Sequence, residues 1–524
     1  MRRSKCLDTR VPIDLSGGVL MGRKVIIVGG GTGGLTAAML LAHKGLDVTV
    51  FEKQQELGGR SGALRMGDYT FDLGCTMLML KFVLDEMFEL VGERTDDHLV
   101  CERLNPLYQL SFGDVSLNMF SEPEQMRAEL EKHFPGSAPG YDLFMYKEKK
   151  RFQKLFPGLQ RDFSSLRSLL SFELISALPY LAIGQSMYSV ISKYFSDERL
   201  KIAMTFQSQY LGMSPWNCPG GFAIIPFLEH YYGIYHVQGG INRIPAAMST
   251  LIEKKGGCIH TGKAVRQLLI TNKKATGVVL EDGSAHHADA VIVNADVAYS
   301  LSQLMNNEHR TRYTPKKLKN FRYSCSTFMI YLGLDTVWKT PAHHTFLFAN
   351  DVKKNMADLF SHYQLPEDIS IYIANPGVND PSMAPPGGSA LYILVPVPNT
   401  RADIDWTQHK QAFRDKVLGL LEQREEFKDL RTHIRCEAVI TPQNWESDFN
   451  IFYGAPFSLA HSLDQMLCFR PRNRFDEIKN CFLVGGGTSP GSGLPTIYES
   501  ARISTNSMLK QFNMTPYPVR PLSR

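Results

Sequence analysis

The stretch Lys24-Val-Ile-Ile-Val-Gly-Gly-Gly-Thr-Gly-Gly34 places an apolar run directly before a cluster of glycines, and a second apolar run follows from Leu35. This order predicts a buried strand, a tight turn and a helix. Gly29, Gly31 and Gly34 stand at the three glycine positions of a GxGxxG motif, where they permit the turn, the approach of a pyrophosphate and the packing of helix on strand. The start of such a helix offers free N–H groups to a phosphate. The stretch therefore predicts an α/β, Rossmann-like domain that binds a dinucleotide.

An acidic residue closes the next predicted strand, which covers residues 47–51. Glu52 follows that strand, 18 residues after Gly34. A carboxylate at this place binds the ribose hydroxyls of a dinucleotide and disfavours a 2′-phosphate. We expect Glu52 and the next residue, Lys53, to contact the cofactor.

Two further segments distinguish FAD from NAD. Gly58-Gly-Arg60 comes shortly after Glu52, and Tyr69-Thr-Phe-Asp-Leu-Gly74 follows it. Here the sequence resembles the large family of flavoproteins that includes amine oxidases and carotenoid desaturases. The resemblance implies that FAD is the cofactor and that Gly59 and Arg60 lie along its phosphates. It also implies that the backbone of Val265 pairs with the adenine and that residues 294–296 reach the cofactor.

A second glycine-rich loop lies near the other end of the chain. Residues 481–484 read as a short apolar strand, residues 485–495 contain five glycines and two prolines, and a helical segment follows. Proline suits the first helical position, so we expect a helix to start at Leu494-Pro495. Its N-terminus would stabilise the negative charge that develops on a flavin ring during reduction. Gly487, Gly493, Leu494 and Pro495 are therefore predicted cofactor contacts.

The middle of the chain is predicted to contribute strands to the dinucleotide-binding domain. Apolar runs punctuated by Asp-Gly between residues 256 and 283 predict a β-meander, and residues 288–294 predict a strand that rejoins the main sheet. The expected fold is a Rossmann-like FAD-binding domain, as in amine oxidases and glutathione reductase, with an α+β substrate domain that carries membrane-associating helices. The predicted boundaries are a disordered extension at 1–22, an FAD-binding domain at 23–100, 236–300 and 475–512, and a substrate domain at 101–235 and 301–474.

The second glycine-rich loop resembles the signature of bacterial-type phytoene and diapophytoene desaturases, which reads G-x-x-T-H-P-G-x-G-x-P. Ser489 stands where that signature has histidine, and Cys75 replaces the proline of the related FDxGP segment. The resemblance runs from about residue 24 to about 509. It implies that the protein removes a hydride from an allylic CH2 to flavin and a proton from the neighbouring carbon, lengthening a conjugated polyene. Such a hydrocarbon substrate requires an apolar tunnel.

Glu229 and His230, in the stretch Phe227–Tyr232, are the first candidates for acid–base chemistry, with Glu499 a weaker one. Other readings stay open: a carotenoid isomerase, saturase or oxygenase of the same superfamily, a flavin amine oxidase, and a prenyl-lipid carrier similar to the Rab GDP dissociation inhibitors, which do not use flavin.

The composition of the chain argues against some classes of binding partner and location. The chain has 524 residues, enough for two domains, and a net charge of +5, too weak to predict nucleic-acid binding. Nine cysteines without a CxxC spacing predict no metal site and a cytoplasmic location. No stretch reaches 18 apolar residues, which argues against a membrane span. The apolar segment 166–190 and the basic clusters 147–151 and 316–319 are compatible with peripheral binding to a membrane surface. Self-association as a homo-oligomer stays open.

Overall fold

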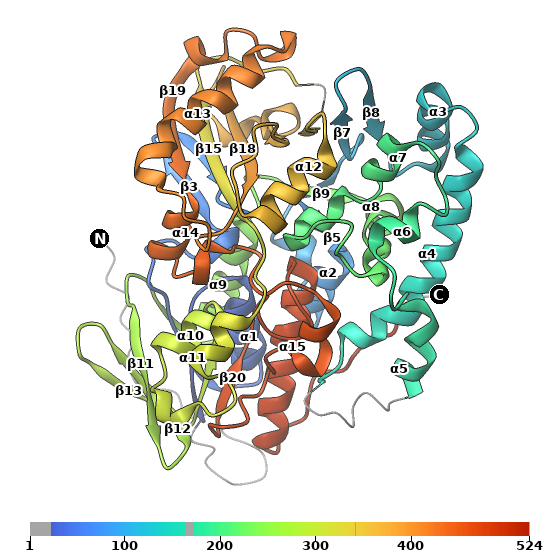
Figure 1. Cartoon of the computed structure of the whole chain (residues 1–524). Coiled ribbons are helices and arrows are strands. Elements are labelled where there is room, and N and C mark those ends of the chain that lie inside the picture. The colour runs from blue at the N-terminus through green and yellow to red at the C-terminus, as the bar shows by residue number, and fades with distance from the viewer. Residues whose placement is uncertain (1–21, 164–171, 341, 523–524) are drawn as a thin grey trace.

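A five-stranded parallel sheet forms around the first glycine motif in the computed structural model, which describes residues 22–163, 172–340 and 342–522 (Figure 1). The predicted extension at 1–22 lies outside the described residues except for Gly22. The strand order is β10 (Cys258–His260), β2 (Asp47–Phe51), β1 (Lys24–Val28), β14 (Ala290–Val293) and β20 (Cys481–Leu483). Every neighbouring pair is parallel. This is the order of a doubly wound dinucleotide-binding sheet, with the chain reversing direction beside β1.

Helices cover this sheet because its strands are apolar on both faces. Helix α1 (Thr32–His43) contacts α15 (Leu494–Gln511) and α9 (Arg243–Lys254). The predicted meander is confirmed: β11 (Val265–Thr271), β12 (Lys274–Leu280) and β13 (Ala285–His287) are antiparallel. Helices α10 (Val297–Gln303) and α11 (Pro315–Asn320) follow β14. The N-terminal and C-terminal segments of the chain therefore share one layer (Figure 1).

A seven-stranded sheet forms the second half of the molecule. Its order is β19 (Ile434–Ile440), β15 (Ser326–Leu334), β18 (Ser389–Val397), β17 (Ile371–Ala374), β16 (His344–Leu347), β7 (Tyr108–Ser111) and β8 (Ser116–Met119). All pairs are antiparallel except β16 with β7. Because side chains alternate along a strand, Phe328 and Ile330 pack toward α13 (Trp406–Glu422), whereas Met329 and Tyr331 lie on the opposite face with Tyr372.

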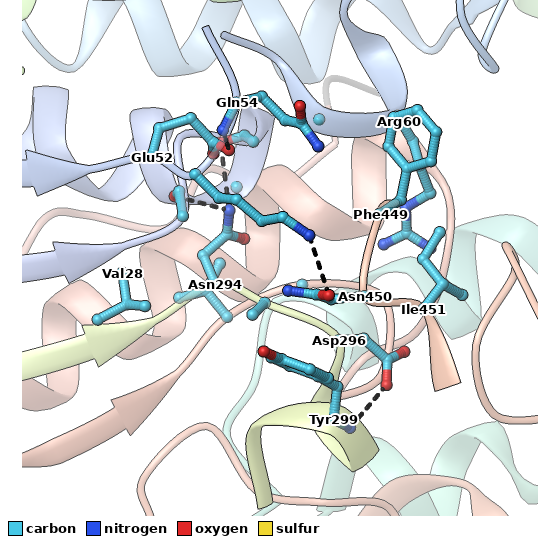
Figure 2. Close-up of a pocket in the computed structure, with 18 of the residues that line it drawn as sticks. Val28, Glu52, Gln54, Arg60, Asn294, Asp296, Tyr299, Phe449, Asn450 and Ile451 are labelled. Carbon is cyan, nitrogen blue, oxygen red and sulfur yellow. Dashed lines mark hydrogen bonds between the residues drawn. The ribbon is translucent and has the colours of Figure 1, made fainter. Parts of the chain in front are cut away.

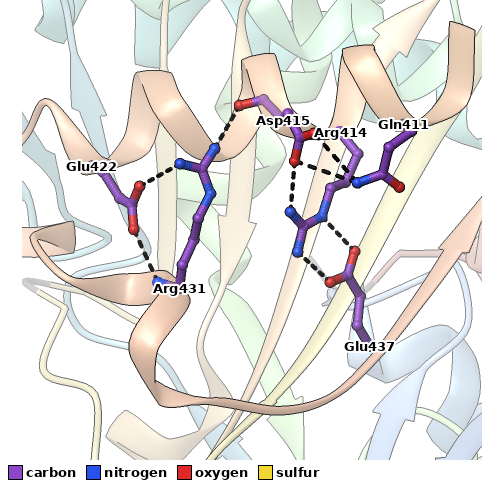
Figure 3. A network of polar contacts seen from close by, with 6 residues as sticks. All are labelled: Gln411, Arg414, Asp415, Glu422, Arg431 and Glu437. Carbon is purple, nitrogen blue, oxygen red and sulfur yellow. Dashed lines mark hydrogen bonds and ion pairs between the residues drawn. The ribbon is translucent and has the colours of Figure 1, made fainter.

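Charged side chains tie α13 to the edge of this sheet (Figure 3). The Arg414 guanidinium donates to both carboxylate oxygens of Glu437 on β19, at 2.8 and 2.5 Å. Arg431 binds Glu422 near the other end of the helix at 2.9 Å. The bidentate pair between Arg414 and Glu437 fixes the orientation of α13 on the sheet as well as adding stability.

A layer of helices lies on the other side of the second sheet (Figure 1). It contains α3 (Pro123–His133), α4 (Ala138–Leu159), α5 (Phe172–Ala177), α6 (Met187–Ile191), α7 (Glu198–Ala203) and α8 (Ile224–Tyr232). The smaller elements are β3 (Ala63–Met66), β4 (Tyr69–Asp72), β5 (Leu78–Met79), α2 (Lys81–Glu89), β6 (Cys101–Arg103), β9 (Ile234–Val237), α12 (Val352–Ala357) and α14 (Pro442–Ser447). Within the described ranges, no helix combines the length and the apolar character that crossing a bilayer requires.

Candidate active site

Two cavities meet between the halves of the molecule. The first has a volume of about 400 Å³ and is lined by both glycine-rich loops, with Glu52, Asn294 and Asp296 among its walls. The second has a volume of about 290 Å³ and extends toward the seven-stranded sheet. Arg60, Ser61 and Ile497 line both cavities. The two spaces are therefore neighbours that share a wall.

The first glycine loop is shaped by its contacts with Asn294. Gly29 has a φ of +97°, and a Cβ there would lie 2.7 Å from the Asn294 carbonyl oxygen. The Asn294 side chain donates from Nδ2 to the Gly29 oxygen at 3.1 Å and to the Gly31 oxygen at 3.3 Å. Gly29 and Gly31 line the first cavity, whereas Gly34 lies behind it, where a Cβ would overlap the Gly29 carbonyl. Gly29 and Gly34 therefore allow close backbone contacts that a side chain would obstruct, and Gly31 borders the cavity where a pyrophosphate is predicted.

Glu52 closes the first cavity at the end of β2 (Figure 2). Its carboxylate accepts the Gly30 N–H at 2.6 Å and the Gln54 N–H at 2.8 Å. Burial raises the pKa of Glu52, and those backbone donors oppose the rise. Lys53 also lines the cavity, and its Nζ donates to the Asp448 carbonyl at 3.0 Å.

Arg60 and Asp296 both line the first cavity and interact electrostatically with each other. Burial lowers the pKa of Arg60, and the Asp296 carboxylate opposes that shift. Arg60 donates to the carbonyl of Pro456. Asp296 caps α10 by accepting the N–H groups of Ala298 and Tyr299, each at 3.0 Å (Figure 2). Val265 also lines this cavity, and its predicted pairing with the adenine stays a prediction.

The second glycine loop connects the two cavities. Gly487 lines the first cavity, whereas Gly493, Leu494 and Pro495 line the second. Helix α15 begins at Leu494, which confirms the predicted start. Its N-terminal turn thus lies at the junction.

Ser489, which replaces the usual histidine of the loop, is buried. A different histidine supports the same loop: Nε2 of His461 accepts the Ser492 N–H at 3.0 Å.

The second cavity is predominantly apolar. Its walls include Met77, Met79, Phe206, Met329, Phe346, Phe348, Leu394 and Trp445, together with Cys75 and the hydroxyl groups of Thr76, Tyr210, Tyr372 and Tyr392. Such a space excludes water and suits an elongated hydrocarbon better than a charged amine.

The predicted acid–base candidates lie behind this wall. Glu229 and His230 are 0% and 1% exposed, and neither lines the first or the second cavity. Glu229 accepts the Tyr108 hydroxyl at 2.8 Å and the Gln207 amide at 2.9 Å. Burial raises the pKa of Glu229 to about 7 and lowers that of His230 to about 4. Glu229 reaches the second cavity through Tyr210, whose hydroxyl interacts with it.

Glu499 is also internal and pairs with the buried Arg502. The sequence did not predict another polar group, which lies on the wall of the second cavity. It consists of Thr76 and Tyr372, and the Tyr372 hydroxyl is hydrogen-bonded to both Thr76 and His344. The only sequence signal for it was the doublet His343-His344 at the start of an apolar strand.

The parallel sheet, the two glycine loops and the apolar cavity beside them define an oxidoreductase that uses a dinucleotide cofactor. Residues 32–509 match the profile of the flavin containing amine oxidoreductases. The chain belongs to this family and, within it, to the carotenoid desaturases. The predicted family, fold class and enzyme class are confirmed, and the cofactor is a flavin. The domain boundaries, the roles of single residues and the membrane association of the helices stay predictions.

Two relatives illustrate this membership, and one solved structure shares the fold. A 4,4'-diapophytoene desaturase (4,4'-diapolycopene-forming) from a Methylomonas species is 50% identical over 92% of this chain and 94% of its own. A zeta-carotene-forming phytoene desaturase from Myxococcus xanthus is 38% identical over 93% of this chain and 94% of its own. An oxidoreductase from Methanosarcina mazei has a similar fold, with a TM-score of 0.59 and 19% identity over 93% of this chain and all of its own.

Proposed function

We propose that the protein desaturates a linear carotenoid precursor of the diapophytoene type. The observation that carries the proposal is the apolar second cavity, which shares Arg60 and Ile497 with the cofactor cavity. A hydrocarbon chain in that space would lie against the cofactor with few groups able to bind water. The 50% identity to a diapophytoene desaturase supports this precursor over longer ones.

FAD is the proposed form of the flavin. The first cavity offers a glycine loop that a Cβ would fill at Gly29, and an acid at Glu52 where a ribose would be held. Gly31 and the start of α1 would hold the diphosphate, with Gly59 and Arg60 beside it. When bound, an oxidised flavin supplies the hydride acceptor.

The chain itself supplies position and charge balance. The apolar walls exclude water from the reacting carbons, and the N-terminus of α15 places partial positive charge at the junction of the cavities. Residues Gly493, Leu494 and Pro495 would face the redox ring. The alternative functions differ from desaturation in the product formed or in the need for flavin. They are an isomerase, a saturase, an oxygenase, an amine oxidase and a lipid carrier.

The test uses purified, flavin-loaded protein with diapophytoene or phytoene supplied in lipid vesicles. We expect new visible absorption bands and a longer polyene by mass spectrometry, faster with diapophytoene. A primary diamine should yield no hydrogen peroxide. Loaded protein that leaves both precursors colourless would refute the proposal, and peroxide from the diamine would favour an amine oxidase.

We propose further that one face of the helical layer rests on an anionic membrane surface. Ile175, Leu178 and Ile183 are 50%, 46% and 60% exposed, and α4, which contacts α5, adds exposed Leu143 and Tyr146. This group of five is called the apolar patch below. Exposed apolar clusters of this kind indicate an interaction surface.

Positive charge borders the apolar patch. Lys150 lies over the Tyr146 ring at 4.1 Å, and Lys149 over the ring of the exposed Tyr231 at 4.8 Å. Lysines next to exposed apolar side chains favour anionic lipid headgroups. These contacts support the apolar patch as the surface for the predicted peripheral membrane location.

Vesicle sedimentation tests this surface. The double variant Leu178→Asp with Ile183→Asp should bind anionic vesicles roughly tenfold less, since two apolar groups are lost and two negative charges gained. Val337→Asp, at an equally exposed valine elsewhere, is the control. Equal binding by both variants would exclude the apolar patch.

A further inference from the structure

Desaturation removes two hydrogens, and only one of them leaves as hydride. The other must leave the apolar cavity as a proton, although most of its wall cannot accept one. The inference below rests on the proposed desaturation and concerns where that proton goes.

Most polar groups on the wall are poor acceptors. Burial raises the pKa of the Cys75 and Cys325 thiols to about 12, which keeps both protonated. The Tyr392 hydroxyl donates to the Gly74 carbonyl at 2.7 Å, and the Thr327 hydroxyl accepts the Trp445 indole N–H at 2.9 Å. Neither leads to a base.

Tyr372 differs because its hydroxyl bonds directly to a histidine. Its Oη lies 2.9 Å from Nδ1 of His344 and 2.6 Å from the hydroxyl oxygen of Thr76. Thr76 and Tyr372 both line the second cavity, whereas His344 is 0% exposed and lies behind them on β16. The Tyr372 ring stacks on Phe346 with centroids 4.6 Å apart, which fixes its direction.

Beyond His344, two further histidine rings pack one against the next. The ring centroids of His343 and His344 are 4.4 Å apart, and those of His236 and His343 are 4.7 Å apart. His236 bonds through Nε2 to Asp380 at 2.8 Å. A space of about 10 Å³, the size of one water molecule, lies beside His343, Thr76 and Asp72. A run of ionisable groups thus leads from the wall to a buried carboxylate.

We propose that Tyr372 takes the proton from the substrate while passing its own proton to Nδ1 of His344. One C–H bond gives its electron pair as hydride to the oxidised flavin. The neighbouring C–H bond then breaks, its electron pair forms the new C=C bond, and its proton goes to Tyr372 Oη. The original O–H bond of Tyr372 breaks as His344 gains a proton, so the phenol ends neutral and the imidazole positive.

The electrostatics of His344 suit brief protonation. Burial, with His343 and His236 nearby, lowers the pKa of His344 well below its usual value, so the resting imidazole is neutral. The same shift favours rapid release of the proton toward His343 and the His236–Asp380 pair. A weak base suffices here because hydride loss leaves a strongly acidic C–H bond beside an allylic cation.

The alternative acceptor is Glu229, acting through Tyr210. Its neighbours are Tyr108, Gln207 and Tyr210, and its pKa is about 7. A carboxylate with that pKa would lose activity as the pH falls below about 7. His344, faced by Tyr372, His343 and His236, would instead remain neutral throughout that range. The two acceptors therefore predict different pH profiles.

The experiment compares Tyr372→Phe, His344→Gln and Tyr331→Phe in flavin-loaded protein, with whichever precursor the wild type converts. Tyr331 is a buried tyrosine outside both cavities that bonds to the Leu73 carbonyl. We expect the first two variants to lower kcat at least about 100-fold with little change in KM, and the control to stay within about threefold. Flavin content and melting temperature should match the wild type. A precursor deuterated at the carbon that loses the proton should show a larger isotope effect in Tyr372→Phe.

Wild-type kcat should stay level between about pH 6 and 8. The proposal is overturned if Tyr372→Phe and His344→Gln keep more than about a tenth of kcat, or if Glu229→Gln alone abolishes turnover and wild-type activity falls below pH 7. If Tyr372→Phe does not fold, His344→Gln and the pH profile decide. A wild type that converts no precursor refutes the proposed function instead.

Discussion

Replacing Gly29 by alanine should weaken flavin binding through a backbone clash, and Gly45 provides a matched control. Both glycines have positive φ, +97° and +79°. Alanine at either place therefore carries a similar conformational cost, about 1–2 kcal/mol. At Gly45 nothing lies within 4 Å of the added Cβ, whereas at Gly29 the Asn294 carbonyl oxygen is 2.7 Å away.

Relief of that contact requires a shift that the loop resists. The Gly29 N–H bonds to the Phe51 carbonyl at 2.8 Å, and the Asn294 N–H bonds to the Val28 carbonyl at 2.8 Å. Both partners are thus held by neighbouring strands. Overpacking of this kind costs about 1–3 kcal/mol beyond the conformational term. Because the displaced atoms line the cofactor cavity, we expect the flavin dissociation constant to rise about 5- to 150-fold in Gly29→Ala relative to Gly45→Ala.

Fluorescence titration of flavin-free protein measures the dissociation constants, and thermal melting measures stability in parallel. Equal flavin affinity in the two variants would refute the reasoning, because it would show that the contact with Asn294 does not hold the loop.

Three further predictions concern charge. Glu52→Gln removes a charged acceptor of two backbone N–H groups, so flavin should bind roughly 10- to 100-fold more weakly by titration, with exposed Glu56→Gln as the control. Arg502→Met leaves its two buried carboxylate partners unpaired and should cost about 3–5 kcal/mol in urea denaturation, whereas Arg520→Met, at an exposed pair, should cost little. The folded protein keeps a proton on Glu229 up to about pH 7, whereas the unfolded chain loses it near 4.5, so wild-type stability should fall by up to about 3 kcal/mol as the pH rises through that window. Glu229→Gln should abolish this fall, and an unchanged pH slope would contradict the assignment.

Local patterns predicted the cofactor side of the molecule well. The first strand, the glycine positions, Glu52 and the start of α15 at Leu494 each depend on residues close together in sequence, where turn chemistry and helix starts are decided. The meander was predictable for the same reason.

The substrate side could not be predicted in this way. Thr76 and Tyr372 are 296 residues apart in sequence. They meet because Thr76 follows β4, which packs against β18, and β18 pairs with β17, the strand that carries Tyr372. The sequence also did not show that Glu229 and His230 are buried behind the cavity wall. Their acid–base role stays a prediction. Sequence distance hides such contacts, because pairing of remote strands is set by the tertiary fold.

Strand β20 and helix α15 enter the cofactor layer from the last part of the chain, between residues 481 and 511. During synthesis, the residues up to 480 therefore leave the ribosome before β20 can join β14. Until then the nascent protein holds an open sheet edge and half of a binding pocket. Loading with flavin must be a late event in biogenesis, and nonsense mutations anywhere before β20 should leave a pale, unloaded product.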